Sequence, residues 1–286
     1  MYMENRSDFK LNCGQFCLDL NACTHIMGIL NVTPDSFSDG GLFFDTDKAV
    51  AHGESMAEEG ADIIDIGGES TRPFSEPVPE EEEIRRVIPV IEKLAPRVSV
   101  PISIDTTKAR VAQYAIEAGA TMINDISALR LDPRMGDVAA KAGVPVVLMH
   151  MQGTPKTMQE SPYYEDVIQE IKLFLVESIK RAEEFGIERG NIIVDPGIGF
   201  GKTVAHNLSI IKHIHVFKSL GVPLLLGVSR KSFITKILGN DMEQRENGTQ
   251  AVLAIAAMNG VEILRVHDVR RAYDTLRIVD EIKNAD

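Results

Sequence analysis

The stretch that decides the fold is GADIIDIGG, residues 60–68, in which a glycine is followed by a compact apolar run. Gly suits the left-handed position that follows the last turn of a helix. An apolar run of about four to eight residues is typical of a strand that is buried on both faces, as in a parallel sheet. The stretch therefore predicts that a helix ends at Gly60 and that a buried strand follows it.

The same pattern recurs along the chain. The other expected strands are the apolar runs at 25–30, 98–104, 119–124, 143–149, 191–194, 221–226 and 260–265, which bring the number to eight. Helical patterns lie between them, as at 46–59 and at 166–185, where an apolar stripe at helical spacing ends at Gly186. Eight strand–helix alternations in fewer than 300 residues predict a (β/α)8 barrel, with an open doubly wound sheet as the alternative.

Two local predictions complete the expected fold. The segment FKLNCGQFCLDL, residues 9–20, precedes the first barrel strand and predicts a small β-hairpin that closes the barrel floor. Thr106 is expected to cap a helix that runs to Ala118. No Ser/Gly-rich linker or low-complexity segment divides the chain, so residues 1–286 are expected to form a single domain, with 1–22 as an N-terminal extension and hairpin.

Composition excludes several classes of protein. The net charge of −12 counts against non-specific binding to nucleic acid, which depends on Lys and Arg. No run of about 18 apolar residues suggests a membrane span, and the start, MYMENRSDFK, has no apolar signal core. Cys13, Cys17 and Cys23 are odd in number and fit no common zinc spacing, which favours free thiols in a reducing cytoplasm.

Polar residues collect where the expected strands end. The active site of a (β/α)8 barrel forms at the carboxyl ends of its strands, and the polar residues found there are Asn31, Arg72, Asp105, Asn124, His150, Asp195, Lys231, Arg265 and His267. Each alone has an ordinary interpretation, such as a helix cap or a structural side chain. Their convergence at one mouth is hard to explain by stability and indicates a binding site.

These groups also divide by chemistry. Arg72, Arg265 and His267 suit an anion. Four others could bind the edge of a nitrogen heterocycle, because carboxylates accept from ring N–H and amino groups while a lysine donates to a carbonyl or ring nitrogen: Asp105, Asn124, Asp195 and Lys231. The stretch GIGFGKT, residues 197–203, looks like a phosphate-binding P-loop but has Pro196 where the first Gly should stand, which disfavours a nucleotide triphosphatase.

A resemblance to a known family rests on these same segments. The chain carries, in order, NVTPDSFSDGG (31–41), GGESTRP (67–73), SIDT (103–106), ND (124–125), DPGIGFGK (195–202), SRKS (229–232) and RVHD (265–268). From about residue 24 to the C-terminus it strongly resembles the dihydropteroate synthases, which are pterin-binding enzymes of folate biosynthesis. The resemblance implies condensation of 6-hydroxymethyl-7,8-dihydropterin pyrophosphate with 4-aminobenzoate to 7,8-dihydropteroate, with release of pyrophosphate. It also implies Mg2+, a homodimer and a target for sulfonamides.

The resemblance assigns roles to residues. The expected pterin-binding residues are Asp105, Asn124, Asp195 and Lys231. The expected pyrophosphate-binding residues are Asn31, Thr71, Arg72, Arg265 and His267. The expected 4-aminobenzoate-binding residues are Phe37, Arg72, Pro73, Phe200, Lys231 and Ser232. Mg2+ is expected near Asn31, with Asp35 as a second candidate ligand. The expected catalytic residues are Asp105, Asp195, Lys231, Arg265 and His267.

Two loops complete the sequence-based hypothesis. The segment 31–41 is expected to be a mobile loop that closes over pyrophosphate and 4-aminobenzoate, with Asp35 and Phe37 as its working residues. Phe74 stands where the family usually has Gly, so the loop after Pro73 is expected to follow a different path. Two alternatives share the pterin pocket: a pterin-dependent methyltransferase barrel, which should lack the pyrophosphate-side residues, and a non-catalytic pterin-binding module, which should lose the mobile loop or Arg265.

Overall fold

Eight parallel strands form the centre of the molecule. The computed structural model describes residues 9–33, 42–70 and 75–285, and within them the strands are β3 (His25–Asn31), β4 (Ile63–Gly67), β5 (Ile102–Asp105), β6 (Met122–Asp125), β7 (Val146–Met149), β8 (Ile192–Asp195), β9 (Leu225–Gly227) and β10 (Ile263–Val266). Strands β3 to β8 pair with one another in chain order, and β10 pairs with both β9 and β3. The Val194 N–H donates to the Pro223 carbonyl at 3.0 Å, and a bridge between Val194 and Leu224 joins β8 to the entry of β9. The sheet therefore closes on itself, as predicted, and is not an open doubly wound sheet.

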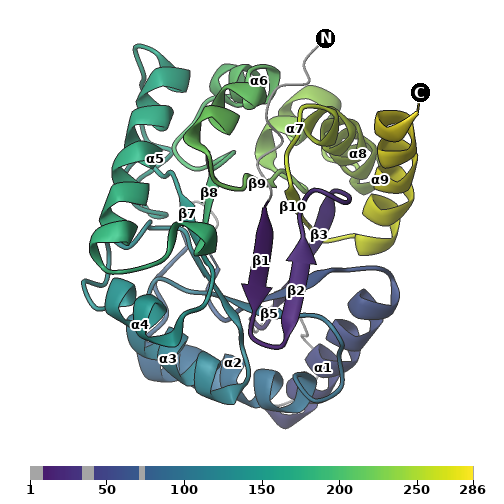
Figure 1. Cartoon of the computed structure of the whole chain (residues 1–286). Coiled ribbons are helices and arrows are strands. Elements are labelled where there is room, and N and C mark those ends of the chain that lie inside the picture. The colour runs from purple at the N-terminus through teal and green to yellow at the C-terminus, as the bar shows by residue number, and fades with distance from the viewer. Residues whose placement is uncertain (1–8, 34–41, 71–74, 286) are drawn as a thin grey trace.

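α-Helices alternate with these strands and surround the barrel (Figure 1). They are α1 (Leu42–Glu58), α2 (Glu80–Leu94), α3 (Ala109–Ala118), α4 (Met135–Ala142), α5 (Val167–Glu184), α6 (Val204–Lys212), α7 (Ser232–Leu238), α8 (Met242–Met258) and α9 (Val269–Asn284). The described ranges also contain two short 3-10 helices, η2 (Arg189–Asn191) before β8 and η3 (Ile214–Leu220) before β9. None of the helices in the described ranges is both long enough and apolar enough to cross a membrane.

Helix α5 illustrates how the sequence pattern produces an element. The Asp166 carboxylate accepts the N–H groups of Ile168 and Gln169 at 3.0 and 3.1 Å, which satisfies donors that have no partner within the helix. Ile171 and Leu175 are fully buried on the face toward the sheet. The helix ends before Gly186, whose φ of +87° is the left-handed conformation that glycine adopts without strain. The predicted stripe and stop are thus confirmed.

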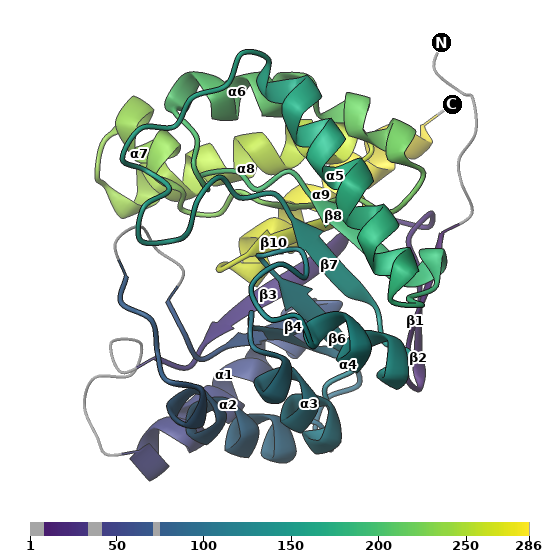
Figure 2. The same ribbon diagram turned by 90° about the vertical axis from the view of Figure 1, so that its left-hand side faces the viewer.

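The N-terminal hairpin closes the barrel floor. Strands β1 (Lys10–Cys13) and β2 (Phe16–Asp19) pair antiparallel around a turn at Gly14. Leu11 and Cys13 are fully buried, and they pack with Leu20 on inward-facing side chains near the starts of the barrel strands, such as Ile63 and Met122. The hairpin crosses the middle of the ring in Figure 1 and lies to one side of the barrel in Figure 2. The hairpin prediction is confirmed.

Two local predictions need correction. Thr106 does not cap α3: its hydroxyl accepts the Lys108 N–H at 3.2 Å in the turn before the helix, and the Asp132 carboxylate accepts the Ala109 N–H at 3.0 Å. A residue distant in the sequence thus supplies the acceptor that was expected from Thr106. The strand predicted at 98–104 begins only at Ile102, because Pro101, which precedes it, has no N–H to donate to a ladder.

The cysteines are free thiols, as expected. Cys13 is buried under the hairpin, whereas Cys17 and Cys23 are exposed. Burial, with the nearby Cys17 adding to it, raises the pKa of the Cys13 thiol to about 12. Partial desolvation by the surrounding atoms, with the negative charge of Asp62 adding to it, raises the pKa of the Cys23 thiol to about 11. Because the thiolate is the reactive form, these thiols are poor nucleophiles at neutral pH.

Candidate active site

The carboxyl ends of the strands bring the predicted polar residues to one rim. Asn31, Asp105 and Asp195 are the last residues of β3, β5 and β8. Asn31 pairs in register with Gly67, Gly67 with Asp105, and Asp105 with Asn124. Asp105, Asn124 and Asp195 are all buried, while Asn31 is half-buried. The parallel register therefore places carboxylates and amides of different strands at one level.

Arg265 of β10 joins this row. Its Nε donates to Asp65 Oδ2 at 2.6 Å, and its Nη2 donates to Asp105 Oδ2 at 2.7 Å. Asp65 also accepts the Asn124 side-chain N–H at 3.0 Å. The four side chains form one continuous hydrogen-bonded row, Asn124–Asp65–Arg265–Asp105, across β6, β4, β10 and β5. The row thus holds the Asn124 amide and the Arg265 guanidinium in place through shared carboxylates.

Asp65 is the central residue that sequence reasoning missed. It lies inside the apolar run of β4, has no exposed surface, and uses Oδ2 for both of its contacts. Its Oδ1 is buried and has no hydrogen-bond partner in the described part of the chain. The signal that could have found it is a carboxylate in the middle of a run expected to be buried on both faces, because buried charges are rarely unpaired.

Burial raises the pKa values of the two carboxylates that end strands, Asp105 and Asp195. Burial raises the pKa of Asp105 to about 7, Arg265 opposes the shift, and the negative charge of Asp65 adds to it. Burial also raises the pKa of Asp195, to about 6, although the 2.7 Å hydrogen bond that it accepts from the Gly197 N–H acts to lower it. For Arg265, burial acts to lower the pKa, but the two carboxylates outweigh it and the pKa is raised. Carboxylates with strongly raised pKa values, held next to specific charged partners, are typical of functional sites.

Lys231 faces Asp195 and Arg265 from the loop after β9. Burial lowers the pKa of its ammonium to about 8, and the positive charge of Arg265 acts in the same direction. Lys231 Nζ lies 4.1 Å from the centre of the Phe200 ring, within cation–π range. A Cβ at Gly199 would lie 3.2 Å from Lys231 Cδ, so the absence of a side chain there leaves room for the lysine. Cation and aromatic ring thus form one wall of the mouth.

A second lysine supports this wall from behind. Lys202 is buried, and its Nζ donates to the Phe200 carbonyl at 2.9 Å and lies 2.9 Å from His150 Nδ1. Burial and the Lys202 charge lower the pKa of His150 to about 2, so the imidazole is neutral and Nδ1 accepts. His150 packs edge-on against the Phe174 ring at 4.8 Å. His150 is therefore a structural side chain.

Other rim residues have separate positions. His267 is half-buried, and both its N–H and its Nδ1 lie within hydrogen-bond distance of Ser229 Oγ, at 3.2 and 3.0 Å. Ser232 is the exposed first residue of α7. Asp125 accepts the N–H groups of Ser127 and Leu129 and so shapes the loop behind Asn124. The residues Asp35, Phe37, Thr71, Arg72, Pro73 and Phe74 lie outside the described residues.

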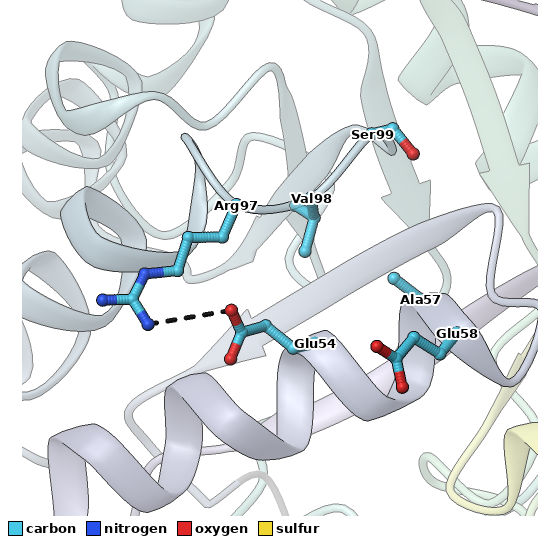
Figure 3. Close-up of a pocket in the computed structure, with 6 residues that line it drawn as sticks. All are labelled: Glu54, Ala57, Glu58, Arg97, Val98 and Ser99. Carbon is cyan, nitrogen blue, oxygen red and sulfur yellow. Dashed lines mark ion pairs between the residues drawn. The ribbon is translucent and has the colours of Figure 1, made fainter.

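A surface pocket of about 420 Å³ lies away from this rim. It is lined by Glu54, Ala57, Glu58, Arg97, Val98 and Ser99, as Figure 3 shows. Glu54 and Arg97 form an ion pair at 3.7 Å across it. These residues come from the end of α1 and from the loop before β5, and so from segments that precede strands. The pocket therefore contains none of the residues at the carboxyl ends.

Comparison with known proteins connects this geometry to a family. The model of the family described as pterin binding enzyme matches residues 27–267, which include every described residue of the rim. The chain belongs to the pterin binding enzyme family. It is 48% identical to the dihydropteroate synthase of Escherichia coli strain K12 over 91% of this chain and 92% of that protein.

Solved structures of the same family agree. The chain superposes on the dihydropteroate synthase of Xanthomonas albilineans with 4-aminobenzoic acid with a TM-score of 0.92, at 47% identity over 98% of this chain and 100% of that one. It superposes on the same enzyme in complex with 7,8-dihydropteroate with a TM-score of 0.87, at 46% identity over 97% and 100% of the two chains. The activity of this pterin binding enzyme is that of a dihydropteroate synthase, a transferase of folate biosynthesis.

Proposed function

We propose that the row of buried polar groups binds the pterin ring of 6-hydroxymethyl-7,8-dihydropterin pyrophosphate. The observation that carries this proposal is the pair of buried carboxylates, Asp105 and Asp195, beside the half-buried Lys231. The amino and ring N–H groups of a pterin would donate to the carboxylates, and Lys231 would donate to its carbonyl or ring nitrogen. Asn124, which is fixed by Asp65, would supply a further amide contact.

Arg265, His267 and Asn31 would bind the pyrophosphate. Thr71 and Arg72, which lie outside the described residues, are proposed to bind it as well. In the reaction, the bond between the pterin methylene carbon and the pyrophosphate oxygen breaks, and its electron pair leaves with pyrophosphate. The methylene carbon becomes cationic and shares its charge with the ring. Asp105 and Asp195, held in place before the reaction, would stabilise this positive charge. The amine of 4-aminobenzoate then forms the new C–N bond and loses a proton to solvent.

The Phe200 ring, Lys231 and Ser232 are proposed to bind 4-aminobenzoate, with Phe37, Arg72 and Pro73 from the segments outside the described residues. The ammonium of Lys231 above the ring of Phe200 provides a cation and an aromatic face in one place. The X. albilineans relative was solved with 4-aminobenzoic acid, which supports a pocket for it in this fold. Lys231 would thus touch both substrates.

A magnesium ion fits the same proposal. Across residues 9–33, 42–70 and 75–285, no three His, Cys, Asp or Glu side chains cluster as a metal cage. Mg2+ commonly binds through one or two protein oxygens together with substrate phosphates and water, so a cage is not required. Asn31 would supply one oxygen, and Asp35 is proposed as a second ligand. When bound, the ion would neutralise negative charge on the pyrophosphate.

We further propose a cytoplasmic homodimer formed by a single domain, residues 1–286. Helices α8 and α9 pack side by side and expose large apolar side chains in their C-terminal halves. These side chains are Ile255, Met258, Ile278 and Ile282, which are 47%, 52%, 64% and 58% exposed. Contact with a second copy would bury this surface. In sedimentation analysis, the proposal expects a dimer that Ile255→Glu converts to a monomer, and a monomeric wild-type chain would contradict it.

The test of the function is product formation. The purified chain, mixed with both substrates and Mg2+, should release pyrophosphate and 7,8-dihydropteroate in equal amounts. Lys231→Met should reduce this rate strongly, while Lys236→Met, on the exposed part of α7, should not. A methyltransferase would instead consume a methylated pterin without pyrophosphate release. A pterin-binding module would bind the pterin without turnover. Either result would contradict the proposal.

A further inference from the structure

Arg230 has a backbone conformation that its residue type disfavours. Its φ is +56°, in the left-handed region where a side chain crowds the backbone. It stands between Ser229, which contacts His267, and Lys231, which faces Phe200. The backbone conformation of Arg230 therefore determines how the side chains of its two neighbours, Ser229 and Lys231, are directed relative to each other. Strained backbone at such a position persists only where its surroundings hold it.

Helix α8 holds both backbone groups of Arg230. Thr249 Oγ1 accepts the Arg230 N–H at 3.2 Å, and Arg245 Nη2 donates to the Arg230 carbonyl at 2.6 Å. Thr249 also donates to the Arg245 carbonyl at 2.9 Å, which fixes its hydroxyl as the acceptor toward Arg230. The two residues are one helical turn apart, so they face the loop together. The backbone of Arg230 is thus bonded on both of its polar groups.

The side chain of Arg230 is held by the same helix. Its Nε lies 3.4 Å from Oε2 of Glu246, which is only 3% exposed. The other carboxylate oxygen of Glu246 accepts from Gln250 at 2.7 Å. An ion pair with a buried carboxylate on a rigid helix restrains the arginine more than a surface pair would. Three contacts from α8, to Arg230 N–H, carbonyl and guanidinium, therefore converge on one strained residue.

We infer that helix α8 positions Lys231 by fixing the left-handed backbone of Arg230. The positioning residues are Arg245, Glu246 and Thr249, none of which lies at the carboxyl end of a strand. Without them, Arg230 would relax toward the right-handed or extended region, and the peptide group before Lys231 would rotate. The Nζ of Lys231 would then leave its place above Phe200 and beside Asp195. The inference rests on the proposed contact of Lys231 with both substrates.

The central test uses Thr249. Thr249→Val keeps the shape of the side chain but removes the acceptor for the Arg230 N–H, and Thr249→Ser keeps the acceptor. We expect Thr249→Val to lower kcat/KM about tenfold, and we expect Thr249→Ser to stay within about twofold of the wild type. The matched control is Thr24→Val: the buried Thr24 hydroxyl also donates to a side chain of a barrel helix, Asp280 of α9, at 3.2 Å, but Thr24 immediately precedes the start of β3, at the barrel floor. This control should leave kcat/KM unchanged.

Rescue separates positioning from simple stability. Gly adopts the left-handed conformation without strain, so Arg230→Gly should be active on its own and should restore most of the activity lost in Thr249→Val. A role in stability alone predicts the opposite: Arg230→Gly would add flexibility and lower the activity further. If Thr249→Val does not fold, the pair Arg230→Gly and Arg230→Val makes the same test, because only the branched side chain is forced out of the left-handed region.

The outcomes distinguish the two proposals. If Lys231→Met keeps normal turnover, the proposed role of Lys231 is wrong and the positioning inference falls with it. If Lys231→Met loses activity but Thr249→Val behaves like the control Thr24→Val, only the positioning inference is wrong. If Thr249→Val loses activity and Arg230→Gly does not restore it, α8 supports the loop without acting through the backbone of Arg230, and the inference is again overturned.

Discussion

Asp65 offers the sharpest test of how the mouth is organised. Its Oδ2 accepts from Arg265 at 2.6 Å and from Asn124 at 3.0 Å, so one oxygen orients a proposed pyrophosphate ligand and a proposed pterin ligand. The substitution Asp65→Asn keeps the volume and can keep an oxygen in that place, with its amide group where the unpartnered Oδ1 now lies. The change therefore removes mainly the negative charge.

The size of the effect follows from these contacts. A hydrogen bond to a charged group contributes about 1.5–3 kcal/mol and a neutral one about 0.5–1.5 kcal/mol. Losing the charge should therefore cost about 1–1.5 kcal/mol of transition-state binding, which is roughly a five- to tenfold fall in kcat/KM. Asp65→Leu leaves both donors without this acceptor, although Arg265 keeps Asp105. Truncating a buried charge pair costs about 2–5 kcal/mol, so a fall of at least about thirtyfold is expected.

The pH dependence of kcat/KM provides an independent test, because the direction of its shift can be predicted. Burial raises the pKa of Asp105 to about 7, and the negative charge of Asp65 contributes to the rise. If the ionised Asp105 is needed, kcat/KM falls as the pH drops through that pKa. Asp65→Asn removes the like charge, so the acid limb should move to lower pH even though the maximum rate is smaller. The control is Asp62→Asn on the same segment, whose carboxylate accepts the Ile26 N–H at the barrel floor. An unchanged acid limb together with unchanged kcat/KM in Asp65→Asn would refute the reasoning.

Three further predictions concern the same mouth. Asp195→Ala should weaken pterin binding by about 1–3 kcal/mol, because it leaves desolvated donors without a partner; calorimetric affinity equal to the wild type would contradict this. Because Lys231 is proposed to touch both substrates, 4-aminobenzoate should bind weakly to the free enzyme and much more tightly with pyrophosphate and Mg2+; equal affinities would reject it. Finally, the pKa of Asp105 is raised on folding from 3.8 to about 7, so its ionisation destabilises the fold as the pH rises through that interval. Asp105→Asn should therefore raise the thermal midpoint at pH 8, with the gain disappearing near pH 4, and a gain that is independent of pH would count against burial as the cause.

The barrel could be predicted because its signals are local. Each buried strand is a short apolar run, and several follow a glycine such as Gly60, whose φ is +105°. The structure confirms these strands and the floor hairpin. A helix boundary could not be predicted where a distant residue decides it: Asp132 supplies the acceptor at the start of α3 that was expected from Thr106. No sequence pattern near Thr106 contains that information.

The site could be predicted only as far as the rim. Asp105, Asn124 and Asp195 each end a strand or nearly end it, so the fold alone brings them together. Asp65 was missed because it lies within an apolar run, two residues before the carboxyl end of β4. Its role depends on Arg265, 200 positions away along the chain. Long-range pairing of this kind is set by the closure of β10 on β3 and is not visible in either segment.

The barrel buries several charged side chains near the carboxyl ends of its strands, and the proposed reaction explains their presence. Asp65, Asp105 and Asp195 carry three negative charges when ionised, and the buried or half-buried Lys202, Lys231 and Arg265 carry three positive ones. Apolar side chains of similar volume would often stabilise a core as well or better, because ions lose their hydration on burial. The proposed reaction gives these charges a use: Asp105 and Asp195 would stabilise the positive charge that develops on the pterin methylene, and Arg265 would bind the leaving pyrophosphate. Stability and turnover should therefore respond in opposite directions when Asp105 or Asp195 is made neutral, because the ionised form that burial disfavours in the resting barrel is the form that the proposed reaction requires.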